Sequence, residues 1–318
     1  MATVSGIGTT YNLPNYTGRL FSVAPSDTPF LSAIGGLTSG GRTTSPEFEW
    51  ETEDLESTSA NNSKTEGATA PTASGVSRAN VSNVVEIHQE SVEVSYTKRA
   101  ATGLHNGINS GDGTNPVIDE LAHQIDLKLK KMGVDIEKSY LGGSYQKPAN
   151  NSTARQTRGI LTAITTNVFA NAGTLRNLTK SIIDNALKDM YANSAPLPQD
   201  RTVLMVSPAQ KVNLSNLYAA NPLSAPPQSR NVGGVNITNI VTDFGEFGVM
   251  LNRYMAADQI AIVDLSVCRP VFLEIPDKGV FFAEPLAKTG SSDKYQLYCE
   301  TGLEYGPQVY HGLIDDLN

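Results

Sequence analysis

The sequence predicts an α+β fold, and three patterns along its 318 residues carry that prediction. Polar and apolar side chains alternate over two separate stretches, residues 46–56 and 84–97, which is typical of strands. One long amphipathic helix pattern follows at residues 116–141. The rest of the chain mixes helical and strand patterns without an internal repeat, so strands and helices are expected to share one mixed architecture.

Residues 1–44 form a segment rich in Gly, Ser and Thr with no sustained helical or strand period. Large apolar residues are scattered through it, among them Phe21 and Phe30. Isolated apolar anchors on an irregular arm suit docking into grooves on another molecule. An arm folded over its own core is the alternative, and the sequence leaves both open.

A long β-hairpin is predicted over residues 45–97. In the outgoing limb, Phe48 and Trp50 alternate with glutamates, as expected for a strand. The return limb, residues 84–97, changes the parity of its apolar residues after Ile87, which predicts a bulge or a twist that redirects the hairpin. Between the limbs, residues 57–80 hold one large apolar side chain, Val76, and bury too little to offset their ordering entropy. A neighbouring molecule would have to order this segment, or it stays disordered.

The long helix is predicted to begin at Pro116, capped by Thr114 or Asn115, and to end before Gly142-Gly143. One apolar stripe follows its length, formed by Leu121, Ile125, Leu129, Met132, Ile136 and Tyr140. Beyond it we expect a helix at 179–190, a buried strand at 202–207 and a helix opening at Pro208. Further strands are expected at 235–242, 249–254, 259–265, 271–275 and within 295–314.

The net charge of −8 and the pI near 5.1 argue against a protein that grips nucleic acid, because phosphate binding favours a basic surface. This charge is still compatible with a protein that encloses DNA without binding it tightly. No leader peptide or membrane-spanning window is apparent, which predicts synthesis in a cytoplasm. The two cysteines, Cys268 and Cys299, are expected to be free, buried thiols.

Signatures of catalysis are missing, so no catalytic residue, cofactor or metal site is predicted. The four histidines, His88, His105, His123 and His311, are far apart and show no metal-ligand spacing. The Gly111–Asn115 stretch lacks the carboxylates of a calcium loop and is expected to be the turn that enters the long helix.

The strongest polar feature is a run of acidic residues at 47–56 that contains no Lys or Arg. A solvated strand face would explain it, and so would an edge matched to a basic patch on another subunit. Under the second hypothesis the basic partners are Lys98, Arg99, Lys128, Lys130 and Lys131. The full set of candidate intersubunit residues is Phe21, Phe30, Phe48, Glu49, Trp50, Glu51, Glu53, Lys64, Lys98, Arg99, Lys128 and Lys131.

The order of these pieces resembles the Hong Kong 97-type capsid fold, and sequence details resemble the SU-ten-like branch of phage major capsid proteins. The details are Asp27–Leu31, Phe48–Trp50, Thr157–Ile160, Phe272–Pro276, Glu300–Tyr305 and Tyr310–Leu313. The resemblance implies an N-arm at 1–44, an extended E-loop hairpin at 45–97, a P-domain at 98–177 with spine helix 116–141, an A-domain at 178–275 and closing P-domain strands at 276–318.

For function, the resemblance implies hexamers and pentamers tiling an icosahedral phage head around double-stranded DNA. Expected partners are other copies of the chain, a portal protein, and scaffold or decoration proteins, with no membrane. Lys64 is the lone lysine near the hairpin tip, but covalent crosslinking is not carried over, because no acidic catalyst can be assigned. An encapsulin-type compartment shell is the nearest alternative; a tail or surface binding protein and an enzyme are the others.

Overall fold

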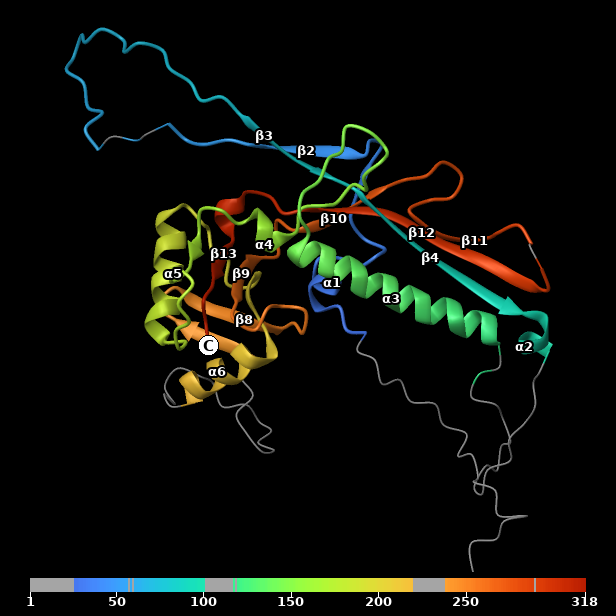
Figure 1. Cartoon of the computed structure of the whole chain (residues 1–318). Helices are drawn as coiled ribbons and strands as arrows, with labels where there is room; N and C mark the ends of the chain where they lie inside the picture. Colours follow the sequence, from blue (N-terminus) through green and yellow to red (C-terminus); the bar gives the residue numbers. More distant parts are fainter. Residues whose placement is uncertain are drawn as a thin grey trace, which may run out of the picture. The chain divides into compact units, whose positions relative to one another are not determined.

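The computed structural model describes residues 26–56, 58, 60–100, 117, 119–219, 238–288 and 290–318 (Figure 1). Phe21, His105 and the Gly111–Asn115 turn lie outside these residues. The chain divides into two compact units. The smaller consists of Met1–Asp27, Gln89–Met132 and Phe282–Tyr298, and the larger of Thr28–His88, Gly133–Phe281 and Cys299–Asn318. Three elements, β4, α3 and β12, have residues in both units.

A six-stranded sheet forms the centre of the larger unit, with strand order β5-β13-β9-β6-β8-β7. Its strands are β5 (Val168–Phe169), β6 (Thr202–Val206), β7 (Asn239–Thr242), β8 (Gly245–Leu251), β9 (Ile260–Asp264) and β13 (Gly312–Ile314). Helices α5 (Lys180–Ala192) and α6 (Pro208–Ala219) pack on it through buried residues such as Leu187 and Leu214. All five residues of β9 are buried, as expected for a strand inside a sheet.

A five-stranded sheet has the order β1-β10-β12-β11, with β4 also pairing with β12. Its strands are β1 (Gly41–Thr43), β4 (Glu86–Ser95), β10 (Arg269–Leu273), β11 (Phe281–Pro285) and β12 (Ser292–Glu304). Short helices α1 (Pro29–Ala33), α2 (Tyr96–Ala100), α4 (Ile160–Ala163) and η1 (Gln308–Tyr310) complete the described elements. The α+β prediction is therefore confirmed, and the predicted helices near 179–190 and 208 correspond to α5 and α6.

The hairpin pairs β2 (Glu47–Thr52) with β3 (Ala79–Val84), in a register that places Phe48 opposite Asn83 and Trp50 opposite Val81. The prediction that the return limb begins at residue 84 is wrong, because residues 79–83, most of them polar, already pair with β2. They show no apolar alternation because the outer part of β3 is exposed. The prediction of a bulge or twist within one strand is wrong: the return limb is divided at Val85 into β3, which pairs with β2, and β4, which pairs with β12. Ile87 is exposed instead of sharing the buried face of Val85.

The long helix α3 runs from Glu120 to Gly142, so the prediction that it starts at Pro116 is wrong. The Asp119 carboxylate accepts hydrogen bonds from the backbone N–H groups of Leu121 (3.0 Å) and Ala122 (3.4 Å), and this cap sets the start. In the larger unit, the apolar stripe buries Ile136 and Tyr140 completely. The Tyr140 hydroxyl donates to the carbonyl of Gly302 (3.1 Å), which fastens the end of α3 to β12.

Candidate assembly surface

The base of the hairpin is fastened to its own chain by two aromatic residues. Trp50 Nε1 donates a hydrogen bond to the carbonyl of Gly306 (3.1 Å), and its ring meets that of Tyr305 edge-on at 4.9 Å. The Phe48 ring stacks on that of Trp50 at 6.1 Å. Phe48 and Trp50, predicted as intersubunit residues, are therefore half-buried against the segment that follows β12.

Asn83 is the second anchor of the hairpin base, and the sequence analysis missed it. Its fully buried amide donates to the carbonyls of Leu303 (2.7 Å) and Arg158 (3.2 Å). The amide oxygen accepts from the backbone N–H groups of Arg158 (2.8 Å) and Val84 (2.9 Å). One side chain thus joins β3, β12 and the segment after α3. The sequence shows no sign of this role, because Asn83 lies among other polar residues and its burial cannot be read from them.

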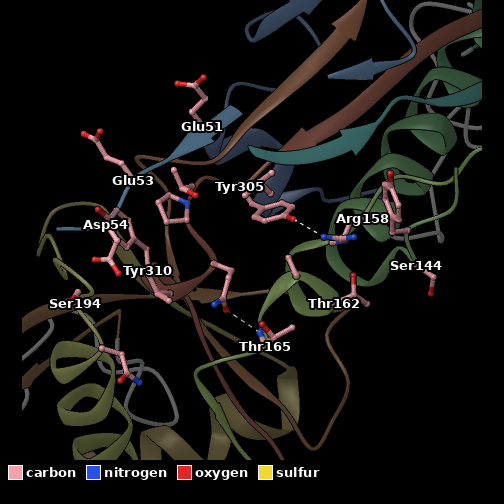
Figure 2. Close-up of a pocket in the computed structure, with 18 residues that line it drawn as sticks. Glu51, Glu53, Asp54, Ser144, Arg158, Thr162, Thr165, Ser194, Tyr305 and Tyr310 are labelled. Carbon is pink, nitrogen blue, oxygen red and sulfur yellow. Dashed lines mark hydrogen bonds between the residues drawn. The ribbon is translucent and has the colours of Figure 1, made fainter. Parts of the chain in front are cut away.

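A groove of about 1050 Å³ lies beside this base, within the larger unit (Figure 2). The hairpin contributes Glu51, Glu53 and Asp54 to one side, and Arg158 lies on the other. The Arg158 guanidinium donates to the Tyr305 hydroxyl (3.1 Å) and lies 4.5 Å from the ring centre of Tyr145. These contacts hold the arginine against two tyrosines, on the side of the groove opposite the acidic residues of the hairpin.

Beyond β2 and β3 the hairpin continues as a loop whose described residues, from Glu53 to Arg78, are all exposed. It extends past the ends of both strands (Figure 1). Lys64 lies near its middle, and Leu55 is 80% exposed. Residues 46–80 carry seven Asp or Glu against two Lys or Arg, so most of the chain's net charge of −8 lies on the hairpin.

The exposed glutamates on β2 have partners across the hairpin. Glu51 accepts from the guanidinium of Arg78 (2.6 Å), and Glu49 accepts from the amide of Asn80 (3.2 Å). The side chains of Glu51 and Arg78 are both more than half exposed, so their ion pair adds little stability. The carboxylates of the loop proper, including Glu53, reach solvent.

The predicted basic partners lie in the smaller unit and each has a carboxylate there. Lys128 (2.7 Å) and Lys131 both bind Glu90, and Arg99 binds Asp293. Lys98 lies 3.9 Å from Glu120. Burial alone would raise the pKa of Glu90, but the bonds and charges of the two lysines hold it below its usual value. These cations are therefore largely neutralised within their own unit.

Phe30 belongs to the core of its own chain: it is completely buried, so its side chain has no surface for a neighbour. That part of the intersubunit prediction does not hold. The buried Glu137 carboxylate accepts from the backbone N–H groups of Phe30 (3.0 Å) and Leu31 (2.6 Å), and from the amide of Asn252 (2.6 Å). Glu137, which sequence reasoning also missed, ties α1 to α3 and to the end of β8.

Among the histidines that the structure describes, His88 and His311 are buried, and both are held neutral. His311 Nδ1 accepts from the backbone N–H of Asp264 (3.2 Å), so Nε2 carries the proton toward the Tyr305 carbonyl at 2.7 Å. Burial lowers the pKa of His311. Burial also lowers the pKa of His88 to about 4, despite the nearby charge of Asp135.

Over the described ranges, no three His, Cys, Asp or Glu residues are placed to hold a metal ion. Cys268 and Cys299 are free and buried, as predicted. Within the same ranges, no helix has the length and apolar character to cross a membrane.

The fold is that of known protein shells. The capsid protein of Cyanophage A-1(L) superposes with a TM-score of 0.68 at 12% identity, over 99% of each chain. The SrpI encapsulin from Synechococcus elongatus superposes with a TM-score of 0.54 at 10% identity, over 93% of each chain. The major capsid protein of Escherichia phage Phieco32 is 25% identical over 341 residues, covering 92% of this chain and 90% of that one.

The chain thus has the fold that these capsid and encapsulin proteins share. Residues 3–318 match the SU10 major capsid protein model, and the chain belongs to that family. It is therefore a structural protein of a bacteriophage capsid and not an enzyme, as the sequence resemblance implied. The encapsulin shares the fold at a lower TM-score, and the family match favours the phage capsid over that alternative.

Proposed function

We propose that this chain self-assembles as hexamers and pentamers into an icosahedral phage head that encloses double-stranded DNA without reading its sequence. Assembly takes place in the cytoplasm of the host bacterium, together with a portal protein and with scaffold or decoration proteins. The net negative charge of the chain supports this proposal, because an acidic shell would not bind the enclosed DNA tightly.

The observation that carries this proposal is the hairpin loop. From Glu53 to Arg78 its described residues are all exposed, although the base is anchored by Asn83 and Trp50. A loop this long without buried side chains is uncommon in a compact domain. A fixed base with an uncovered end is the arrangement expected of an element that a neighbouring subunit covers.

Within this proposal the chain divides functionally into an arm (1–44), a hairpin (45–97), a P-domain (98–177 and 276–318) and an A-domain (178–275). The residues assigned to intersubunit contacts are those of the exposed hairpin, Glu49, Glu51, Glu53 and Lys64, together with Phe21 of the arm. Lys98, Arg99, Lys128 and Lys131 keep their assignment as a second, largely neutralised contact surface.

Electron microscopy of the chain expressed with its neighbouring genes tests the proposal. Closed icosahedral shells containing DNA are expected. Shells filled with a protein cargo would point to a compartment of the encapsulin type, and a stable monomer at high concentration would overturn self-assembly altogether.

Limited trypsin digestion then tests whether assembly covers the loop. Cleavage after Lys64 should be fast in free subunits and at least about tenfold slower in shells, because proteases need an accessible, locally mobile chain. The Lys64→Gln variant, which lacks the site, identifies the band. Equal cleavage rates in both states would show that no neighbour covers the loop.

A further inference from the structure

Tyr218, near the end of α6, carries a buried hydroxyl group that has no hydrogen-bond partner. The residue is 2% exposed, and no described residue donates to or accepts from its hydroxyl oxygen. A buried polar group without a partner is destabilising, so nearly all such groups in native proteins bond to protein, water or an ion. The environment of Tyr218 therefore points to a bound species next to its hydroxyl.

Asp184, on α5, is a second polar residue of the larger unit that lacks a partner. Its carboxylate oxygen Oδ1 is buried and accepts no hydrogen bond from any described residue. Burial raises the pKa of Asp184, and the charge of Asp243 acts in the same direction. The charge of Lys180 opposes both, but Lys180 donates no hydrogen bond to Oδ1. The contacts within the chain thus leave the charge of this carboxylate poorly compensated.

The core of the six-stranded sheet brings Asp184 and Tyr218 together. Ile183, the residue before Asp184, belongs to the same buried cluster as Tyr218, and α5 and α6 both contribute to it. The charge of Asp184 also acts on Tyr218, whose pKa burial raises to about 12. A carboxylate oxygen without a donor therefore lies near a hydroxyl group without a partner.

Asp243, in the turn between β7 and β8, adds a second carboxylate. Phe244, the next residue, packs against the same core, and its ring centre lies 6.3 Å from that of Tyr191 on α5. Tyr191 follows Asp184 by seven residues, or two helical turns, so both lie on the same face of α5. That face therefore lies beside the turn that carries Asp243. Asp243 itself is exposed, so this side of the cluster is open to solvent.

Two carboxylates and a hydroxyl are oxygen ligands of the kind that calcium and other hard cations prefer. Within the described residues, fewer than three His, Cys, Asp or Glu gather here, so backbone carbonyls and water would complete the coordination of an ion. A water molecule could bond Tyr218 to Asp184, but it would leave two negative charges near each other. A divalent cation compensates for both charges and pairs both buried oxygen atoms, so it fits these residues better.

His88 is a weaker candidate for a binding site. Its Nε2 is also buried without a partner, and the charge of Asp135 acts on it. One imidazole and one carboxylate offer an ion too few protein ligands. The cluster around Asp184 and Tyr218 is therefore preferred.

We propose that Asp184, Asp243 and the Tyr218 hydroxyl bind a divalent cation, of which calcium is the best match. The ion joins α5, α6 and the β7–β8 turn, which pack on the same core, and so stabilises the larger unit. All three residues belong to one chain, so this inference does not rest on the proposed self-assembly.

Thermal unfolding of the full-length chain in calcium and in chelator tests the site. Saturating calcium should raise the unfolding midpoint by at least about 4 °C, because an ion that binds only the folded state stabilises it. Asp184→Asn should remove this shift. In chelator the same variant should be at least as stable as the unaltered chain, because it removes a poorly compensated charge.

Asp189→Asn is the matched control, because Asp189 lies on the same helix but pairs with Lys188 (3.5 Å). This variant should keep the full calcium shift. No shift in the unaltered chain, or an equal shift in Asp184→Asn, overturns the proposal and leaves a buried water molecule as the partner of Tyr218.

Terbium luminescence gives an independent readout, because a terbium ion in a calcium site emits when a tyrosine beside it absorbs light. The full-length chain should show this emission, and added calcium should displace it. Tyr218→Phe should lose most of the emission, whereas Tyr295→Phe, altered in the smaller unit, should keep it. Emission that persists in both Asp184→Asn and Tyr218→Phe would place the ion elsewhere and overturn this site.

Discussion

The two ends of the hairpin are built on opposite principles. At the base, Asn83 makes four hydrogen bonds and Trp50 packs against Tyr305, so the strands are held by their own chain. From Glu53 onward, the described side chains lie in solvent and the charge is strongly acidic. The base therefore determines the direction of the hairpin, while the loop is the part that the proposed self-assembly would cover. Substitutions should separate the two, with stability falling at the base and assembly failing at the loop.

The largest effect is expected at Asn83. In Asn83→Ala, two carbonyls and two N–H groups lose their partner in a buried site, which should lower the free energy of unfolding by about 3–4 kcal/mol. Denaturant unfolding of the unassembled subunit measures it. Asn80→Ala, on the exposed part of the same strand, is the control and should change stability by less than about 0.5 kcal/mol. Similar values for the two would remove the distinction between base and loop.

Trp50→Ala should cost less, about 2 kcal/mol, because the ring is only half-buried and its removal loses one hydrogen bond and two aromatic contacts. The hairpin should also become mobile at its base, visible as faster amide exchange of β3. Glu49→Ala, on the neighbouring exposed position, should leave exchange unchanged. Unchanged exchange in Trp50→Ala would show that Asn83 alone holds the base.

Low pH should destabilise the hairpin base through His311, whose ring is hydrogen-bonded to the carbonyl of Tyr305. Burial lowers the pKa of His311 below its usual value of 6.5, so the unfolded chain binds the proton first. Stability is therefore fully present above pH 6.5 and declines as the pH falls below it. His88, with a pKa of about 4, acts in the same direction. Unfolding midpoints at pH 7.5 and 5.5 measure the loss, and His311→Gln should reduce it; an equal loss in the variant would assign it elsewhere.

The smallest effect on stability is expected in the loop. Leu55→Ser should change the free energy of unfolding by less than about 0.5 kcal/mol, because the side chain is 80% exposed. The yield of shells, measured by sedimentation, should nevertheless fall. A destabilised subunit would mean that the loop packs on its own chain in solution.

Sequence patterns predicted the elements whose burial is periodic. The stripe on α3, the buried strand β6 and the limb around Phe48 and Trp50 all followed from spacing that local geometry imposes. Strand β3 was missed because only its last two residues, Asn83 and Val84, are buried and one of them is polar, so pairing with β2 left no clear apolar alternation. The start of α3 depended on which of several capping residues the fold uses, and it uses Asp119.

The candidate site was less accessible to sequence reasoning. Asn83 and Glu137 are buried polar residues whose partners lie far away in the chain, and no local pattern distinguishes them from surface residues. Phe30 appeared to be a free anchor because the sequence around it is irregular, yet α1 places it in the core. Charge, by contrast, could be read directly, because the acidic hairpin is contiguous in sequence.

The glycine at position 302 has a consequence for how such a hairpin is aimed. A Cβ atom there would lie 2.8 Å from the Phe48 ring and 2.7 Å from the Val84 carbonyl, closer than carbon atoms tolerate. The absence of a side chain at Gly302 therefore leaves the space that Phe48 and Val84 of the hairpin occupy. A methyl group at this position would rotate the hairpin at its base, and a small rotation there would displace the loop by a larger distance. The curvature of a whole shell would then depend on the absence of one methyl group in each subunit.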